Sequence, residues 1–271
     1  MPLHSTDPAP ERILAFGPAG SGKTTNILNV ARFSQITKAP TKFYVVDTDF
    51  AMDRMMAGYP EIRFSIFGDS NFQDPDARLT IYPCFEWRDY SRSLADIQMQ
   101  ARPGDWVAVD FIGTAWTAVQ EEYVNEVFHK DIAEYFLQVR KEMTKGDKTF
   151  TALEGWIDWP VVNAMYRKWA NRLLFRGRYH LYATAKSDNL SSERKPIEDA
   201  PFRALFARFQ VKPVGQKELP FVFHTVLLSG REGDKRTLTA VKDRERAEVV
   251  GLEIKNFTTD YLVNVAGFKL A

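Results

Sequence analysis

The chain has 271 residues, 45% of them hydrophobic and 26% charged, and its 36 Lys and Arg side chains nearly balance its 35 Asp and Glu side chains. This ordinary globular usage excludes a disordered or fibrous chain and a strongly basic or acidic tail. The single cysteine, Cys84, excludes an intrachain disulfide framework and suits a reducing compartment, so we expect a cytoplasmic protein. The four histidines share no metal-ligand spacing, which argues against zinc. No apolar run approaches the roughly 18 residues of a membrane span, so we expect no membrane partner.

Residues 1–10 are rich in proline and have no apolar stretch of the kind that a signal peptide carries. We therefore expect them to form a flexible leader. No linker rich in Pro, Gly or Ser divides the remainder, so residues 11–271 are predicted to form one domain.

Short apolar runs, bounded by Gly, Pro or Asp, alternate with longer helical patterns along the chain. The alternation predicts an α/β fold with a mostly parallel central sheet flanked by helices. The last two runs lie close together around a charged turn at 230–235, so they are expected to form antiparallel strands near the C-terminus. The strands are expected at 12–16, 42–47, 63–67, 79–82, 106–110, 179–184, 223–228 and 237–242.

Helical spacing of apolar residues predicts a long helix over 114–145 and a second over 159–175. The second carries an aromatic and aliphatic stripe that either packs in the core or offers a platform for nucleobases, and the core is the commoner outcome. The stripe comprises Val162, Met165, Tyr166, Trp169 and Leu173. Residues 187–201 are polar, contain two prolines and directly follow a strand, so we expect a mobile surface loop.

The most specific signal is a glycine-rich segment between the first strand and an amphipathic stretch. It fits the pattern G-x-x-x-x-G-K-[ST], in which glycines let the backbone wrap around phosphate groups and the helix N-terminus adds partial positive charge. We expect Lys23 to reach the β- and γ-phosphates and the Thr24 hydroxyl to ligate Mg²⁺, which makes ATP and Mg²⁺ the predicted cofactors. The predicted cofactor-binding residues here are Gly17, Pro18, Ala19, Gly20, Ser21, Gly22, Lys23, Thr24 and Thr25.

A second metal anchor is expected at Asp110, where the apolar strand 106–110 ends in a carboxylate. Phe111 follows it, at a position where several classes of P-loop ATPase carry a catalytic glutamate, so the base must come from elsewhere. Asp47 and Asp49 end another strand, and either could orient an attacking water. The alternative is that these two carboxylates only shape a turn.

With these motifs in place, the chain resembles the RecA-like branch of P-loop ATPases. That family has a similar acid-x-Ala-x-Asp string after its second core strand, and the resemblance implies that Asp49 is the catalytic base. The same likeness implies that Thr184 or Lys186, at the end of the strand after the Mg²⁺-binding one, senses the nucleotide. It also places the loop 187–201 where recombinases of this class contact DNA.

The string from Val241 to Arg244 resembles the Lys-x-Arg string of RadA, KaiC and DnaB-type members. There the two cations reach the γ-phosphate bound by a neighbouring subunit, which implies that Lys242 and Arg244 act in trans within a ring or filament. A solvated β-turn is the alternative. The wider layout also resembles phage-encoded RecA-like proteins, including single-strand annealing proteins, which would imply the host cytoplasm.

Charge is distributed unevenly, since residues 166–246 hold 18 Lys and Arg against 9 Asp and Glu, and the rest holds 18 against 26. Such a basic region either contacts a phosphate backbone or is simply solvated. Phe202, Phe206 and Phe209 lie among its arginines, at a spacing that fits base stacking or, more commonly, one buried helix face.

The favoured hypothesis is an ATP-hydrolysing, RecA-like homo-oligomer that acts on single-stranded DNA in recombination or annealing. A hexameric DNA motor, either a helicase or a packaging ATPase, would share the same nucleotide-binding residues. A P-loop protein without a DNA substrate, such as a small-molecule kinase, is the third possibility.

Overall fold

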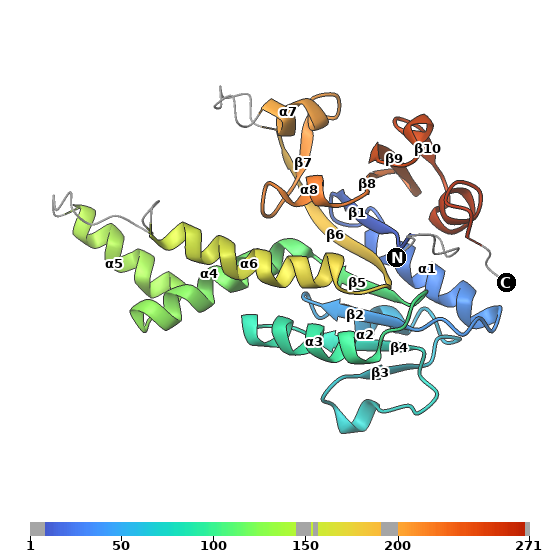
Figure 1. Ribbon diagram of the computed structural model, residues 1–271, viewed down its shortest axis with the longest axis horizontal. Helices are drawn as coiled ribbons and strands as arrows, with labels where there is room; N and C mark the ends of the chain where they lie inside the picture. The colour runs from blue at the N-terminus through green and yellow to red at the C-terminus, as the bar shows by residue number, and fades with distance from the viewer. Residues whose placement is uncertain (1–8, 145–152, 154–156, 191–199, 269–271) are drawn as a thin grey trace, which may run out of the picture.

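The computed structural model describes residues 9–144, 153, 157–190 and 200–268, and its centre is one ten-stranded sheet (Figure 1). The strand order is β10-β9-β8-β1-β6-β5-β2-β4-β3, and β7 pairs with β6 off this path. Most of the predicted leader, residues 1–8, lies outside the described residues.

The strands from β8 to β3 in this order, namely β8, β1, β6, β5, β2, β4 and β3, run parallel to one another. Every residue of β1, β2 and β5 is buried, because helices cover both faces of the sheet and leave no solvated side. The bounds are β1 Arg12–Gly17, β2 Phe43–Asp47, β3 Phe64–Ile66, β4 Leu79–Pro83, β5 Trp106–Asp110, β6 His180–Asn189 and β8 Thr225–Glu232.

The antiparallel strands at the C-terminal end are confirmed. β8 pairs with β9 (Lys235–Asp243), and β9 pairs with β10 (Glu253–Ile254). The expected turn at 230–235 is shorter than predicted, because pairing continues out to Glu232 and Lys235. Gly233 adopts a φ of 59°, which a glycine allows in the remaining two-residue turn. The predicted fold class, a mostly parallel α/β sheet with flanking helices, is therefore confirmed.

Two layers of side chains cover the sheet, and alternate residues of β1 divide between them. Leu14 and Phe16 face the layer formed with α3 (Trp87–Gln100), α4 (Ile112–Phe128) and α6 (Asp158–Phe175). Ile13 and Ala15 face the layer formed with α1 (Lys23–Ile36), α2 (Met52–Met56) and the π-helical turn η4 (Phe257–Val263). The period of two along a strand explains this division. The remaining short elements are η1 (Ser70–Phe72), α7 (Ala200–Phe206), β7 (Val211–Pro213), α8 (Leu219–Val222) and η3 (Ala247–Val249).

The long helix predicted over 114–145 is wrong as a single element. The structure has α4 and then α5 (Ile132–Thr144), which run beside α6 as an arm projecting from the sheet (Figure 1). His129 ends α4 with a left-handed φ of 54°, and the Asp131 side chain accepts a hydrogen bond from the Glu134 N–H at 2.7 Å. A left-handed C-cap followed by a new N-terminal acceptor stops one helix and starts the next.

The aromatic stripe on α6 packs in the core, as the commoner interpretation predicted. Tyr166 and Trp169 are 2% and 4% exposed, and the Trp169 indole N–H donates to the Tyr90 carbonyl at 3.2 Å. These rings are therefore not a platform for nucleobases.

The sequence reading missed α3, which starts with a reciprocal capping box between Glu86 and Asp89. It also ended β6 too early, because residues 187–189 continue the strand and pair with β7. Within the predicted loop 187–201, residues 191–199 lie outside the described part of the chain. No helix in the described ranges has the length and apolar character to span a bilayer.

Candidate functional site

The predicted site residues, except Lys242 and Arg244, converge at the carboxyl ends of the parallel strands. Asp47 and Asp110 are directly paired across β2 and β5, and Gly17 is paired with Lys186 across β1 and β6. β6 lies between β1 and β5, so the end of a third strand enters the space between the glycine-rich loop and Asp110. In open α/β sheets, ligands bind in crevices outside these strand ends.

Three glycines give the loop its shape. Gly20 and Gly22 have φ values of 72° and 89°, in the left-handed region that side chains with a Cβ adopt at a cost. A Cβ on Gly17 would lie 2.1 Å from the Ser229 carbonyl oxygen. Because α1 begins at Lys23, its first N–H groups have no partner within the helix and can bind an anion at this end.

Lys23 is held inside this loop. Its ammonium group donates to the carbonyls of Gly17 at 3.0 Å and Pro18 at 2.8 Å, and its side chain is buried. Burial lowers the pKa of Lys23, and the Asp110 carboxylate opposes that shift. The lysine is thus positioned at the centre of the loop before any ligand binds.

Thr24 and Thr184 both donate to the Asp110 carboxylate. The Thr24 hydroxyl reaches one oxygen at 2.9 Å, and the Thr184 hydroxyl reaches the other. Asp110 is 4% exposed, and burial raises its pKa against the effect of these two donors. A hydroxyl and a carboxylate are hard oxygen ligands, so this pair fits Mg²⁺ by its chemistry.

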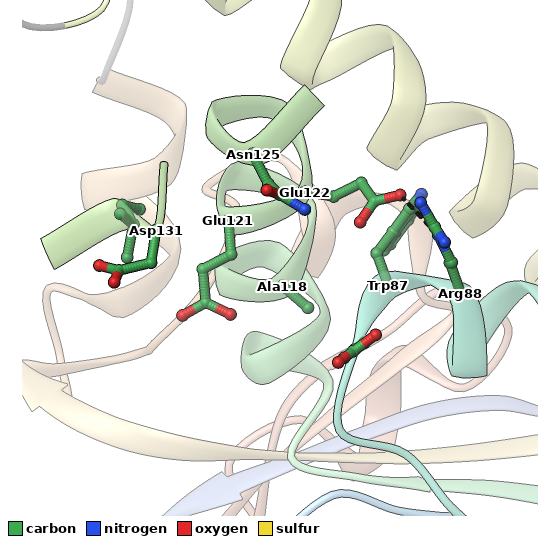
Figure 2. Close-up of a pocket in the computed structure, with 9 residues that line it drawn as sticks. Trp87, Arg88, Ala118, Glu121, Glu122, Asn125 and Asp131 are labelled. Carbon is green, nitrogen blue, oxygen red and sulfur yellow. Dashed lines mark hydrogen bonds and ion pairs between the residues drawn. The ribbon is translucent and has the colours of Figure 1, made fainter. Parts of the chain in front are cut away.

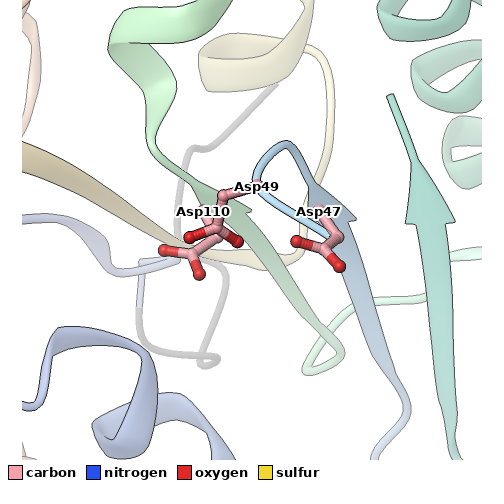
Figure 3. Close-up of side chains that lie close together, drawn as sticks. All are labelled: Asp47, Asp49 and Asp110. Atoms are coloured by element: carbon pink, nitrogen blue, oxygen red, sulfur yellow. The ribbon is translucent and has the colours of Figure 1, made fainter. Parts of the chain in front are cut away.

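Asp47 and Asp49 lie beside Asp110, with the three side chains facing one another (Figure 3). One carboxylate oxygen of each lies within 4.8 Å of the others. Asp47 is buried and caps α2 by accepting from the Met52 N–H at 3.2 Å, while no donor among the described residues reaches its other oxygen. Burial, with the neighbouring Asp49 and Asp110, raises the pKa of Asp47 to about 6. Asp49 lies beyond the strand and is exposed, where a water molecule could reach it.

Lys186 and Lys23 both approach the ring of Phe111. Their ammonium nitrogens lie 5.0 and 5.7 Å from the ring centroid, within the range of cation–π attraction. Phe111 has a left-handed φ of 59°, and its N–H donates to the Thr184 hydroxyl at 2.8 Å. Sequence reasoning noted only that Phe111 is not a glutamate. It also missed Thr48, whose hydroxyl donates to the Asp110 carbonyl at 2.7 Å.

The structure does not bring Lys242 and Arg244 to the glycine-rich loop of the same chain. Lys242 is paired with Val226 near the start of β8, so it lies toward the amino ends of the parallel strands, away from the loop. Burial, with the charge of Arg244, lowers the pKa of Lys242 to about 8. The Lys242 ammonium donates to the carbonyls of Pro220, Phe221 and Phe223 at 2.9, 3.1 and 2.6 Å, and Arg244 donates to the Phe221 carbonyl as well.

Two other arginines, which sequence reasoning missed, lie beside the loop. Arg231 on β8 is adjacent to Gly20, and Arg236 on β9 is adjacent to Gly22. No local sequence pattern marks them, because the hairpin that carries them is distant from the loop in the chain.

The basic region is partly used inside the protein. Arg246 bonds both carboxylate oxygens of Glu11, at 2.9 and 3.0 Å, and also contacts Asp243. Phe206 is fully buried and meets Phe16 edge to face at 5.5 Å, which confirms the buried-face interpretation for that residue. Exposed cations remain on α6 and just after it, at Arg167, Lys168, Arg176 and Arg178.

A separate pocket of about 410 Å³ lies between α3, α4 and the start of α5 (Figure 2). Its lining includes four acidic residues, Glu86, Glu121, Glu122 and Asp131, and one basic residue, Arg88, which pairs with Glu122 at 3.3 Å. This charge is unfavourable for a phosphate, so we assign the pocket no part in nucleotide binding.

No protein-family model matches the chain, and no curated protein matches it. Among solved structures, the chain is similar to one described as a crystal structure of the RadB recombinase. That similarity covers 90% of this chain and 86% of the other, with a TM-score of 0.49 and 15% sequence identity.

Proposed function

We propose that the protein is a RecA-like P-loop ATPase, formed by residues 11–271 as one domain, that acts on single-stranded DNA. The observation that carries the proposal is the 2.9 Å hydrogen bond from Thr24 to Asp110. It joins the helix that follows a complete phosphate-binding motif to the carboxylate at the end of a buried strand. These two groups are the pair that a nucleotide-bound Mg²⁺ requires.

Phosphate binding is assigned to the loop from Gly17 to Thr25. Its backbone N–H groups and the N-terminus of α1 would surround the anion, and Lys23 would exchange its loop carbonyls for phosphate oxygens. Thr24 and Asp110 would hold Mg²⁺, which, when bound, neutralises charge on the phosphates. Thr184 keeps Asp110 in place from the side of β6.

Hydrolysis is assigned to Asp49. It is the exposed member of the three neighbouring aspartates, so it can accept a hydrogen bond from an attacking water and orient it. Asp47 caps α2 with one oxygen and is buried, which suits a positioning role. Lys186, at the end of β6 beside Phe111, is assigned to contact the nucleotide and report its state to β6.

Assembly into a ring or filament is proposed on the placement of Arg244. Its side chain is exposed, and it lies at the amino ends of the parallel strands, whereas the loop of its own chain lies at their carboxyl ends. Only a nucleotide on another chain is therefore within its reach. Lys242 would have to leave three carbonyls to act with it.

Binding of single-stranded DNA is proposed on the exposed cations around the end of α6. Lys168, Arg176 and Arg178 are exposed there, and Phe175 between them is 59% exposed. Cations that follow a backbone, together with an aromatic ring for base stacking, are the usual features of a single-strand binding surface.

The test pairs two variants that remove one lysine charge each. Lys23→Ala is expected to abolish ATP binding, measured by calorimetry, and to leave oligonucleotide binding without nucleotide unchanged. Lys168→Ala is expected to weaken oligonucleotide binding and to leave ATP binding unchanged. Wild-type ATP binding that survives Lys23→Ala would refute the nucleotide site, and oligonucleotide affinity independent of salt would refute phosphate contact. Transfer of the phosphate to a small-molecule acceptor would indicate a kinase.

A further inference from the structure

The β8–β9 hairpin packs directly on the phosphate-binding loop. The Ser229 hydroxyl on β8 donates to the Ser21 carbonyl at 2.8 Å, and this contact is buried. A Cβ added to Gly22 would lie 2.7 Å from Cδ of Arg236, and one added to Gly17 would lie 2.1 Å from the Ser229 carbonyl oxygen. The hairpin and the loop thus approach each other as closely as glycine permits.

Two arginines of this hairpin are placed opposite each other. Arg231 and Arg236 are paired across β8 and β9, so their side chains share one face of the hairpin. That face is turned to the loop, because Arg231 reaches within 3.4 Å of the Cβ position of Gly20 and Arg236 contacts Gly22. The hairpin therefore adds two guanidinium groups beside the N-terminus of α1.

The present hydrogen bonds of both arginines lie on the exposed surface of the protein. Arg236 donates to the Thr25 hydroxyl at 3.4 Å, and the described residues include no ion pair to it. Arg231 donates to the Gly233 carbonyl at 2.7 Å and lies 3.7 Å from the Asp234 carboxylate, which is fully exposed. Neither arginine is required inside the protein, so both can turn to an anion at little cost.

The neighbouring lysine behaves differently. Lys235 precedes Arg236 on β9, so its side chain points to the other face, where it pairs with Glu253 at 3.4 Å. It carries the same charge on the same hairpin without facing the loop.

We propose that Arg231 and Arg236 clamp the phosphate chain of the bound nucleotide in cis, an inference that rests on the proposed nucleotide site. One guanidinium group can donate two parallel hydrogen bonds to the oxygens of a phosphate. The α1 N-terminus and Lys23 would supply further positive charge from the loop. The ligand class is a nucleoside polyphosphate, since each added phosphate gives the clamp more charge to bind. The clamp is separate from the trans role assigned to Arg244, because it is complete within one chain.

The experiment measures the Kd of ATP and ADP by calorimetry for the wild type, for Lys23→Ala and for four further single variants. We expect Arg236→Ala to weaken ATP binding by about 10- to 100-fold, since a charge-assisted hydrogen bond is lost. Arg231→Ala is expected to weaken it by about 5- to 50-fold, and both losses should be smaller for ADP. The matched control Lys235→Ala removes the same charge from the other face and should change Kd by less than about twofold. Arg236→Lys keeps the positive charge but cannot donate two parallel hydrogen bonds, so it should bind ATP more tightly than Arg236→Ala and more weakly than the wild type.

Outcomes separate this inference from the proposed function. If the wild type binds no nucleotide, both are wrong. If Lys23→Ala loses binding while both arginine variants bind as tightly as the wild type, the nucleotide site stands and the clamp is wrong. Equal losses for Lys235→Ala and Arg236→Ala would show a general charge effect and would also overturn the clamp. Mixing Arg236→Ala with Lys23→Ala protein should restore no hydrolysis, and recovery would show that the arginines act between chains.

Discussion

Replacing Thr184 by valine tests how β6 supports Asp110, the carboxylate proposed to hold Mg²⁺. Thr184 is 2% exposed, and its hydroxyl donates to Asp110 while accepting from the Phe111 N–H at 2.8 Å. Valine has nearly the same shape, so the substitution removes these two hydrogen bonds without opening a large cavity.

The expected loss of stability follows from the two partners left behind. A hydrogen bond to a charged carboxylate contributes about 1.5–3 kcal/mol, and a buried N–H left without a partner costs about 1–3 kcal/mol. Because the two effects share one site and are not fully additive, we expect the free energy of unfolding to fall by about 3 kcal/mol. Thr184→Ser keeps the hydroxyl and loses one methyl group, so it should cost only about 1 kcal/mol.

The assay is urea unfolding without nucleotide or Mg²⁺, followed by fluorescence, so that only the protein's own contacts contribute. Thr184→Val should lower the urea midpoint and leave the slope of the transition unchanged. The same variant should bind ATP more weakly when Mg²⁺ is present, because Asp110 is less firmly held. A valine variant with the wild-type midpoint would show that the Thr184 hydroxyl does not support Asp110, and the reasoning would fail.

Three further predictions address the site and the fold. Asp49→Asn should keep ATP binding within about threefold and reduce hydrolysis at least about 100-fold, since the water loses its base, and normal turnover would assign the base elsewhere. Mixing Arg244→Ala with Lys23→Ala protein should restore part of the hydrolysis rate if active sites are shared between chains, whereas no recovery would favour a site complete in one chain. His180 accepts from the Glu11 N–H at 3.1 Å, and burial together with Arg12 lowers its pKa to about 4. Unfolded histidine binds a proton below about pH 6.5, so acidification to about pH 5 should cost about 2 kcal/mol of folding stability. Urea unfolding at neutral pH and at about pH 5 should show a smaller loss of folding stability for His180→Gln than for the wild type. An equal loss would refute the role given to His180.

The glycine-rich loop proposed to bind phosphate could be predicted from the sequence because the residues that form its motif are contiguous. Gly17 to Thr24 provides the turn, the lysine and the hydroxyl within one short segment, and the strand before it is uniformly apolar. Asp110 was recognisable for a similar reason, since it ends a buried strand of five residues. The sheet order then placed both at one edge, as parallel strands require.

Helix boundaries depended on local features that periodicity does not register. The helical pattern continues across His129, and only the left-handed backbone there and the cap at Asp131 divide α4 from α5. The apolar stripe of α6 was placed correctly, because helical spacing alone decides which of its side chains face the sheet.

The sequence by itself determined the α/β class, the glycine-rich loop and the aspartates that end two strands, Asp47 and Asp110. Each of these features depends only on residues that are neighbours in the chain. Only the tertiary structure decided which distant cations reach that loop. It placed Arg231 and Arg236 beside Gly20 and Gly22, and it placed Lys242 against two carbonyls of α8 and the carbonyl of Phe223. The physical reason is that β9 runs antiparallel to β8. Arg236 therefore pairs with the end of β8, beside the loop, whereas Lys242 pairs with the start of β8, at the other end of the parallel strands.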